Sequence, residues 1–143
     1  MNKVSEIRLH SAWWTLRLSF GLVPFLAGLD KFFNILADWG SYVSPAAAAL
    51  LPFSVATLMA IVGLVEIVVG MAVLTLAPRL GAYVASAWLL LVAINLVAGG
   101  HFDVAVRDVV MSIAAFTLAR GIEVREVATA TAHAGVVTHT VTA

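Results

Sequence analysis

The chain has 143 residues, of which 62% are hydrophobic and 11% are charged, and its mean hydropathy is +1.04. This composition differs from that of soluble domains and indicates an integral membrane protein. Eight basic and eight acidic residues give no net charge, and there is no basic run, so the composition argues against a nucleic-acid partner. Cysteine is absent, which excludes disulfides, thiolate metal sites and a cysteine-based redox relay in this chain.

Residues 12–29 form the first predicted membrane span, after a polar and mildly basic N-terminal segment. The stretch contains Arg17 and Pro24 and lacks a small-x-small cleavage pattern, so it indicates a retained helix rather than a signal peptide. Pro24 predicts a kink. Gly21 and Gly28 predict close packing of a neighbouring helix.

Residues 30–52 form the longest connection, and they mix polar and apolar side chains. Residues 32–36 and 46–51 are too apolar for a freely solvated loop. We therefore expect a short helix at the membrane surface, with Trp39 and Tyr42 at headgroup level. Such a segment is suited to act as a lid.

Residues 53–76 are the strongest predicted span and carry a single ionisable side chain, Glu66, near the middle. A carboxylate at that depth costs at least ~2.5 kcal/mol on insertion scales, so it should face other helices and have a partner. Gly63 and Gly70 share the helix face of Glu66 and allow a neighbouring helix to approach it.

The rest of the chain predicts two further spans and a tail. The expected segments are a tight turn at 77–81, a third span at 81–98, a turn at 99–103, a shorter fourth span at 104–119 and a low-complexity tail at 121–143. The predicted fold is therefore an all-α integral membrane four-helix bundle, residues 1–120. We expect the tail to be cytoplasmic and mobile.

Basic residues predict the orientation of the chain in the cell (inner) membrane. Five of them fall on one predicted side, namely Lys3, Arg8, Arg79, Arg120 and Arg125. Lys31 and Arg107, each flanked by acids, fall on the other. Both termini should therefore be cytoplasmic.

The depth of each polar residue predicts two polar layers in the bundle. Arg17 and Glu66 differ by about five residues of depth, or ~8 Å, so we expect them to form one buried ion pair near the cytoplasmic side. An outer layer should gather Asn95, His101, Asp103, Arg107 and Asp108 with Asp30 and Lys31.

Within the outer layer, Asp103 and Asp108 differ in their predicted roles. Asp103 opens a helix, where it complements the dipole, and stands four residues before Arg107 as a helical ion pair. Asp108 shares a face with Ser112 and Ala115, so it should point into the bundle.

Catalytic and metal-binding patterns are not found in the sequence. There is no phosphate-binding glycine loop, nucleophile elbow, His-Glu-x-x-His or paired histidines for haem. His10, His101, His133 and His139 share no metal-ligand spacing. No metal site and no resident cofactor are predicted.

The spacing of the polar motifs resembles that of the DoxX family of small four-helix membrane proteins. The resemblance covers residues 16–120. It is carried by Arg17 followed by Gly28-Leu29-Asp30-Lys31-Phe32, by Gly63-x-x-Glu66-x-x-x-Gly70, by Pro78-Arg79-Leu80-Gly81, and by Asp103-x-x-x-Arg107-Asp108.

The resemblance implies a membrane component of a redox or oxidative-stress pathway, because the family is named after the membrane subunit of a thiosulfate:quinone oxidoreductase. Site candidates are Arg17, Asp30, Lys31, Glu66, Asn95, Arg107 and Asp108. A quinone is the expected ligand, and a flavin or haem would come from a partner redox enzyme. Two alternatives stay open, a non-catalytic anchor or assembly subunit and a carrier of small solutes or protons formed by a homo-oligomer.

Overall fold

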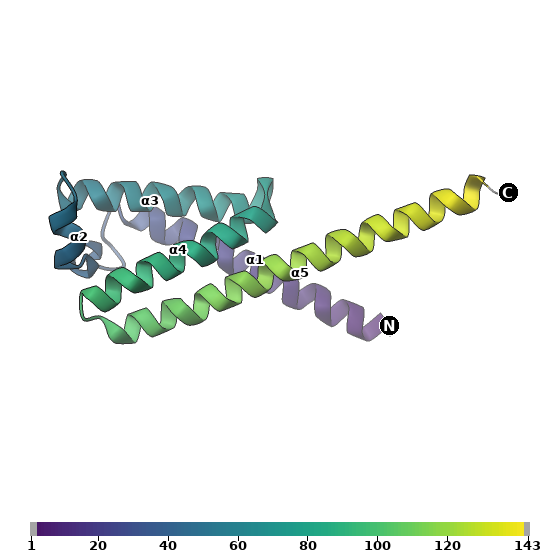
Figure 1. Ribbon diagram of the computed structural model, residues 1–143, viewed down its shortest axis with the longest axis horizontal. Helices are drawn as coiled ribbons and strands as arrows, with labels where there is room; N and C mark the ends of the chain where they lie inside the picture. The colour runs from purple at the N-terminus through teal and green to yellow at the C-terminus, as the bar shows by residue number, and fades with distance from the viewer. Residues whose placement is uncertain (1–2, 142–143) are drawn as a thin grey trace.

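The computed structural model describes the backbone of residues 3–141 and the side chains of residues 8–75 and 77–131. All regular elements of this described part are helical (Figure 1). The α-helices are α1 (Lys3–Asp30), α2 (Pro45–Leu50), α3 (Val55–Met71), α4 (Pro78–Ala98) and α5 (Phe102–Val141). A 3-10 turn, η1, covers Trp39–Tyr42, and a π-helical turn, η2, covers Ala72–Leu76.

Three segments of the described helices are long and apolar enough to cross a membrane: Arg8–Asp30, Val55–Thr75 and Pro78–Ala98. They agree with the first three predicted spans and support the assignment to the membrane proteins. The fourth predicted span lies in α5, which is not among these three segments.

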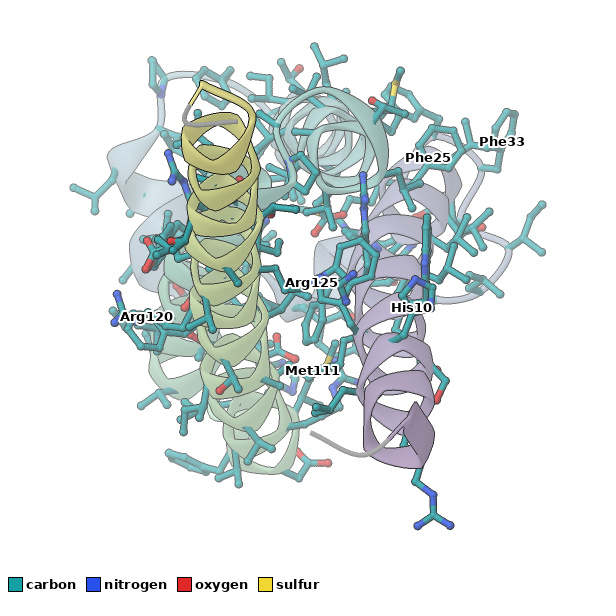
Figure 2. All side chains as sticks on the ribbon, turned by 90° about the vertical axis from the view of Figure 1, so that its right-hand side faces the viewer. His10, Phe25, Phe33, Met111, Arg120 and Arg125 are labelled. Carbon is teal, nitrogen blue, oxygen red and sulfur yellow. The ribbon has the colours of Figure 1, made fainter. Side chains whose placement is uncertain are left out.

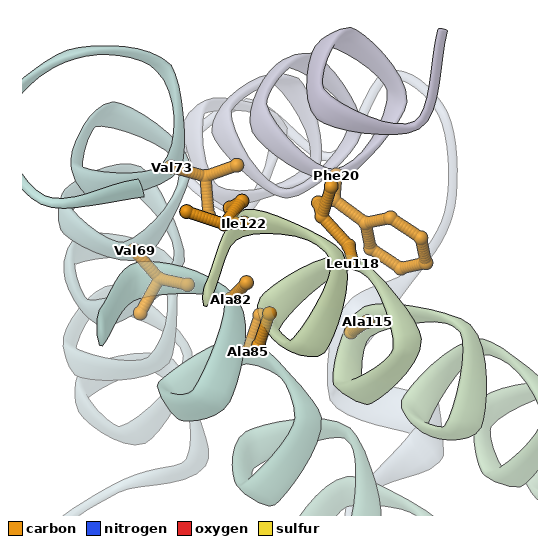
Figure 3. Close-up of a cluster of buried hydrophobic side chains, with 9 residues drawn as sticks. Phe20, Val69, Val73, Ala82, Ala85, Ala115, Leu118 and Ile122 are labelled. Atoms are coloured by element: carbon orange, nitrogen blue, oxygen red, sulfur yellow. The ribbon is translucent and has the colours of Figure 1, made fainter. Parts of the chain in front are cut away.

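The helices pack as two close pairs, α1 on α3 and α4 on α5. Side chains from both pairs meet in one buried apolar cluster (Figure 3), made of Phe20, Val69, Val73, Ala82, Ala85, Ala115, Leu118, Ala119 and Ile122. Large apolar side chains also point outward from the same helices, including Leu22, Leu64, Leu91 and Ile113. Large apolar residues on the outer surface fit helices that are solvated by lipid.

Glycines allow the close approach of α1 and α3. A Cβ atom added at Gly63 would lie 2.5 Å from the carbonyl oxygen of Gly28, and one added at Gly70 would lie 2.5 Å from that of Gly21. These distances are too short for any side chain, so only glycine fits at these crossings. The predicted role of the glycines beside Glu66 is confirmed, and the helix that approaches is α1.

Two features differ from the sequence-based prediction. The turn predicted at 77–81 is shorter, since α4 begins directly at Pro78, which is well placed at the first position of a helix. The chain is also helical beyond residue 120, because α5 continues unbroken to Val141. Helix α1 continues through Pro24, in agreement with the single first helix that was predicted, and the kink at this residue stays a prediction.

The two ends of the molecule differ in what they carry. One end, here called the loop end, holds residues 31–54 and 99–101, and the other, the terminal end, holds both chain termini and Ala77 (Figure 1).

Candidate functional site

The centre of the polar site is an ion pair between Lys31 and Glu66. Lys31 Nζ lies 2.5 Å from Glu66 Oε2, and the two side chains are only 5% and 13% exposed. Lys31 follows the last residue of α1, and Glu66 lies in the middle of α3. The lysine therefore reaches back from the end of its helix to the carboxylate.

The pair forms because α1 and α3 are in contact at the turn beside it. A Cβ atom at Gly63 would lie 3.1 Å from the Cβ of Lys31, so the glycine leaves the space that the lysine stem occupies. The Lys31 ammonium also stands 3.8 Å from the centre of the Trp39 ring. A cation over an indole face is attracted to it, which adds to the pairing with Glu66.

The predicted pair of Arg17 and Glu66 does not form. Arg17 instead donates from Nε to the carbonyl oxygen of Val73 at 3.0 Å and from Nη2 to that of Leu74 at 2.7 Å. Its guanidinium also lies over the rings of Trp13 and Trp14. A similar depth was not sufficient to predict the pair, because Lys31 is the residue that pairs with the Glu66 carboxylate.

The two carbonyl groups bound by Arg17 lack their usual helical partners for identifiable reasons. Pro78 has no N–H to donate to Leu74, four residues before it. The N–H of Ala77 goes to Ala72 in the π-helical turn rather than to Val73. Arg17 therefore satisfies two acceptors that the end of η2 leaves open, a local role that the sequence analysis missed.

Asp30 organises the loop that follows α1. Its carboxylate accepts hydrogen bonds from the backbone N–H groups of Ile35 and Leu36, both at 3.0 Å, and from Trp39 Nε1 at 2.8 Å. The last bond holds the Trp39 ring over Lys31. Asp30 is thus a positioning residue for the site, and its carboxylate is used within the protein.

Asn95 and His101 connect the same loop to the end of α4. Asn95 accepts from the N–H of Ser44 at 3.0 Å and donates to the carbonyl oxygen of Tyr42 at 2.8 Å. His101 Nε2 lies 3.3 Å from the carbonyl oxygen of Ser41. Asn95 therefore holds the loop at the end of α4, and its role as a ligand residue stays a prediction.

Asp108 is buried, as predicted, and is 5% exposed. Its partner is Arg107, whose Nε lies 3.1 Å from Asp108 Oδ1. The predicted pair of Asp103 with Arg107 is therefore wrong, although Asp103 does lie in the first turn of α5. The Arg107 side chain is 64% exposed, so it extends from the buried carboxylate towards the surface.

Helix α4 adds a donor that sequence reasoning missed. Trp88 Nε1 is buried and approaches the Glu66 carboxylate, but it lies beyond hydrogen-bonding distance and has no partner within the described residues. The negative charge of Asp108 also acts on that of Glu66. Lys31, which follows α1, and side chains from α3, α4 and α5 thus form one polar centre around Glu66, whereas Arg17 lies apart from it.

A groove of about 380 Å³ opens beside this centre at the loop end. Its polar side includes Lys31, Asn34 and Asp38, and its apolar side includes Val55, Ala56 and Met59. Its volume falls within the range of small-molecule sites, and a few polar groups on an apolar wall are typical of such sites.

The class of protein that fold and site define is an all-helical membrane protein with a buried polar centre. No family model, curated protein or solved structure matches the chain. The resemblance to the DoxX family therefore stays a prediction.

Among the described side chains, no group of three or more His, Asp or Glu is arranged to hold a metal ion. His133 and His139 lie outside the described side chains.

Proposed function

We propose that this chain is a DoxX-like membrane protein of four spans that binds a quinone, or a carbonyl compound of similar size, in the groove beside Lys31. It would serve there as the membrane component of a redox or oxidative-stress pathway. The observation that carries the proposal is a shielded ammonium group, held by Glu66 and Trp39, at the wall of an apolar groove.

The chemistry of the groove supports a carbonyl ligand. Lys31 has three N–H donors and no acceptor, and among the described side chains Glu66 is its one ion-pair partner. A ligand oxygen would accept from a remaining N–H, while Val55 and Met59 would contact the ring face. Glu66, bonded to the same ammonium, is placed to exchange a proton with the ligand through Lys31. Electrons would come from a flavin or haem of a partner enzyme.

The outward face of α5 supports a fourth span. Large apolar side chains are exposed along it, among them Val106, Val110, Ile113 and Phe116. Such a surface is stable in lipid and unfavourable in water. Arg8, Arg79, Arg120 and Arg125 belong to the terminal end, so the basic-residue rule favours cytoplasmic termini in the cell (inner) membrane.

Reporter fusions test the four-span orientation. A green fluorescent protein fused after Arg125 should be fluorescent, and alkaline phosphatase fused at the same place should be inactive. An active phosphatase would show that α5 does not cross the membrane in the proposed direction.

Ligand binding tests the groove directly. A short-chain quinone should raise the thermal stability of the purified protein in detergent and quench tryptophan fluorescence. Ala56→Trp should abolish both effects, because it fills the groove without touching the ion pair, whereas Leu64→Trp, on the outward face of α3, should leave them intact. Binding that survives Ala56→Trp would place the quinone elsewhere.

A second candidate function, that of an anchor or assembly subunit, is favoured by the exposed apolar side chains of α5 beyond residue 120. Val124 and Val127 are 67% and 66% exposed on this helix, a surface available to a partner protein or a second copy. Truncation after Glu123 removes both valines and should then abolish copurification of a partner or oligomer from native membranes and leave quinone binding unchanged. Loss of both properties would instead indicate a folding role for the extension.

A further inference from the structure

The second groove of the molecule lies far from Lys31, between α1 and α5, and has a volume of about 340 Å³. It is lined by Leu16, Val110, Ile113, Ala114 and Thr117. The only polar group among these five side chains is the hydroxyl of Thr117, which donates a hydrogen bond to the carbonyl oxygen of Ile113 within α5. The groove therefore fits a hydrocarbon chain.

Towards the terminal end, this groove leads to a cluster of basic and aromatic side chains. Trp13 lies one helical turn before Leu16, and Arg125 lies two turns beyond Thr117 on the same face of α5. The guanidinium of Arg125 stands 4.5 Å from the centre of the Trp13 ring, and that of Arg17 stands 5.1 Å from it. In Figure 2 Arg125 points from α5 towards α1.

The helix surface between groove and cluster is open. A Cβ atom added at Gly121 would meet nothing within 4 Å, and Gly121 lies midway between Thr117 and Arg125. An elongated molecule can therefore run along α5 from the apolar groove to the guanidinium groups without a barrier at this position.

The cluster has positive charge and N–H donors, and no carboxylate among the described side chains balances this charge. Arg79 and Arg120 pair with Glu126 and Glu123, whereas no carboxylate pairs with Arg125 in the described part of the chain. Trp13 Nε1 is buried there and has no acceptor within the residues that the structure describes.

We propose that the α1–α5 groove and its cluster bind an anionic phospholipid, with an acyl chain along Leu16 and Ile113 and the phosphate at Arg125 and Arg17. The apolar channel ends at the guanidinium of Arg125, which has no carboxylate partner in the described part of the chain, and at that of Arg17, which bonds to backbone carbonyl groups rather than to a carboxylate. These two parts match the acyl chain and the phosphate of such a lipid. Basic residues at a cytoplasmic interface also face the anionic leaflet. The inference rests on the four-span arrangement proposed above but not on the quinone groove.

Native mass spectrometry of the detergent-purified protein tests the proposal, with phosphatidylglycerol and phosphatidylcholine of identical acyl chains in competition. Phosphatidylglycerol should be retained preferentially. Arg125→Gln should weaken its binding about fivefold, the effect of removing one basic residue near the membrane surface. Arg120→Gln removes the same charge from a paired residue and should change binding much less.

Gly121→Leu provides a second variant that leaves every charge in place. It should fold, because the position is open, and it should reduce retention of both lipids by blocking the channel. Equal retention of the two lipids by the parent, equal effects of Arg125→Gln and Arg120→Gln, or displacement of the lipid by millimolar inorganic phosphate would each overturn the proposal. An active phosphatase in the fusion after Arg125 would contradict the four-span arrangement on which this inference rests, and it would leave the proposal of quinone binding untouched.

Discussion

Lys31 and Arg17 are both basic residues that enter the packed helices, but the structure neutralises them in different ways. Lys31 meets a full negative charge on Glu66, with a tryptophan ring on another side. Arg17 meets only the partial charges of two backbone carbonyl groups. The first arrangement joins two helices through a charge pair, and the second completes the end of a helix.

The chemistry of each cation suits its task. A lysine ammonium is a compact charge on a flexible stem, which can turn back from the end of α1 to one carboxylate oxygen. The guanidinium of Arg17 is a planar fork, which donates to Val73 and Leu74 at once. This difference predicts that the stability of the Lys31 region depends on the two opposite charges, and that the stability of the Arg17 region depends on the geometry of the guanidinium.

The largest effect should come from breaking the Lys31 pair on one side. Lys31→Met or Glu66→Gln alone should each lower the free energy of unfolding by about 3 to 5 kcal/mol, because a buried charge or polar group loses its partner. The double variant Lys31→Met/Glu66→Gln should recover much of the loss. Chemical denaturation in detergent measures the cycle, and additive losses would show that the pair is not coupled.

The next effect concerns Arg17. Arg17→Met should cost about 2 to 3 kcal/mol, since charged hydrogen bonds to two carbonyl groups are lost. Arg17→Lys should fall between Met and the parent, because it keeps the charge but not the fork. Arg17→Met and Glu66→Gln should be additive; a coupling above about 0.5 kcal/mol between them would contradict the separation of the two regions.

The sequence predicted those features that depend on a single helix, and it did not predict contacts that depend on how two helices are placed against each other. Apolar length predicted the three helices that are long and apolar enough to cross a membrane. The glycines near Glu66 predicted the close crossing, and helical periodicity predicted the burial of Asp108. The partner of Glu66 could not be read in this way. Depth along a helix ignores rotation about its axis and the reach of a side chain from the helix end, and both decided in favour of Lys31.

The role of Arg17 was hidden for a different reason. It depends on a proline that removes one hydrogen-bond donor and on a π-helical turn that redirects another. Pro78 is visible in the sequence and could have pointed to an unpaired carbonyl at Leu74. The π-helical turn is a product of packing and leaves no comparable pattern.

A smaller effect on stability is expected where glycines allow α1 and α3 to cross closely. This crossing matters for both the Lys31 and the Arg17 region, because it holds α1 on α3. Gly63→Ala should cost about 1 to 3 kcal/mol through overpacking against the backbone of Gly28. Gly121→Ala is the matched control, since its added methyl group meets open space. It should be neutral or stabilise the helix by up to about 1 kcal/mol. Equal melting temperatures for the two variants would argue against the close crossing.

The smallest effect should come from Asp103, and it tests whether the charges on α5 follow the structure or the sequence pattern. If Asp103 paired with Arg107 at helical spacing, Asp103→Asn and Arg107→Gln would be coupled. In the structure Arg107 bonds to Asp108 instead, and Asp103 is exposed. Asp103→Asn should therefore change stability by less than about 0.5 kcal/mol, as is usual for surface substitutions, and its effect should be the same with Arg107 or Gln at position 107. A larger loss of stability that disappears in the Arg107→Gln background would show that Asp103 pairs with Arg107 after all. Asp108 would then lack its basic partner at the start of α5.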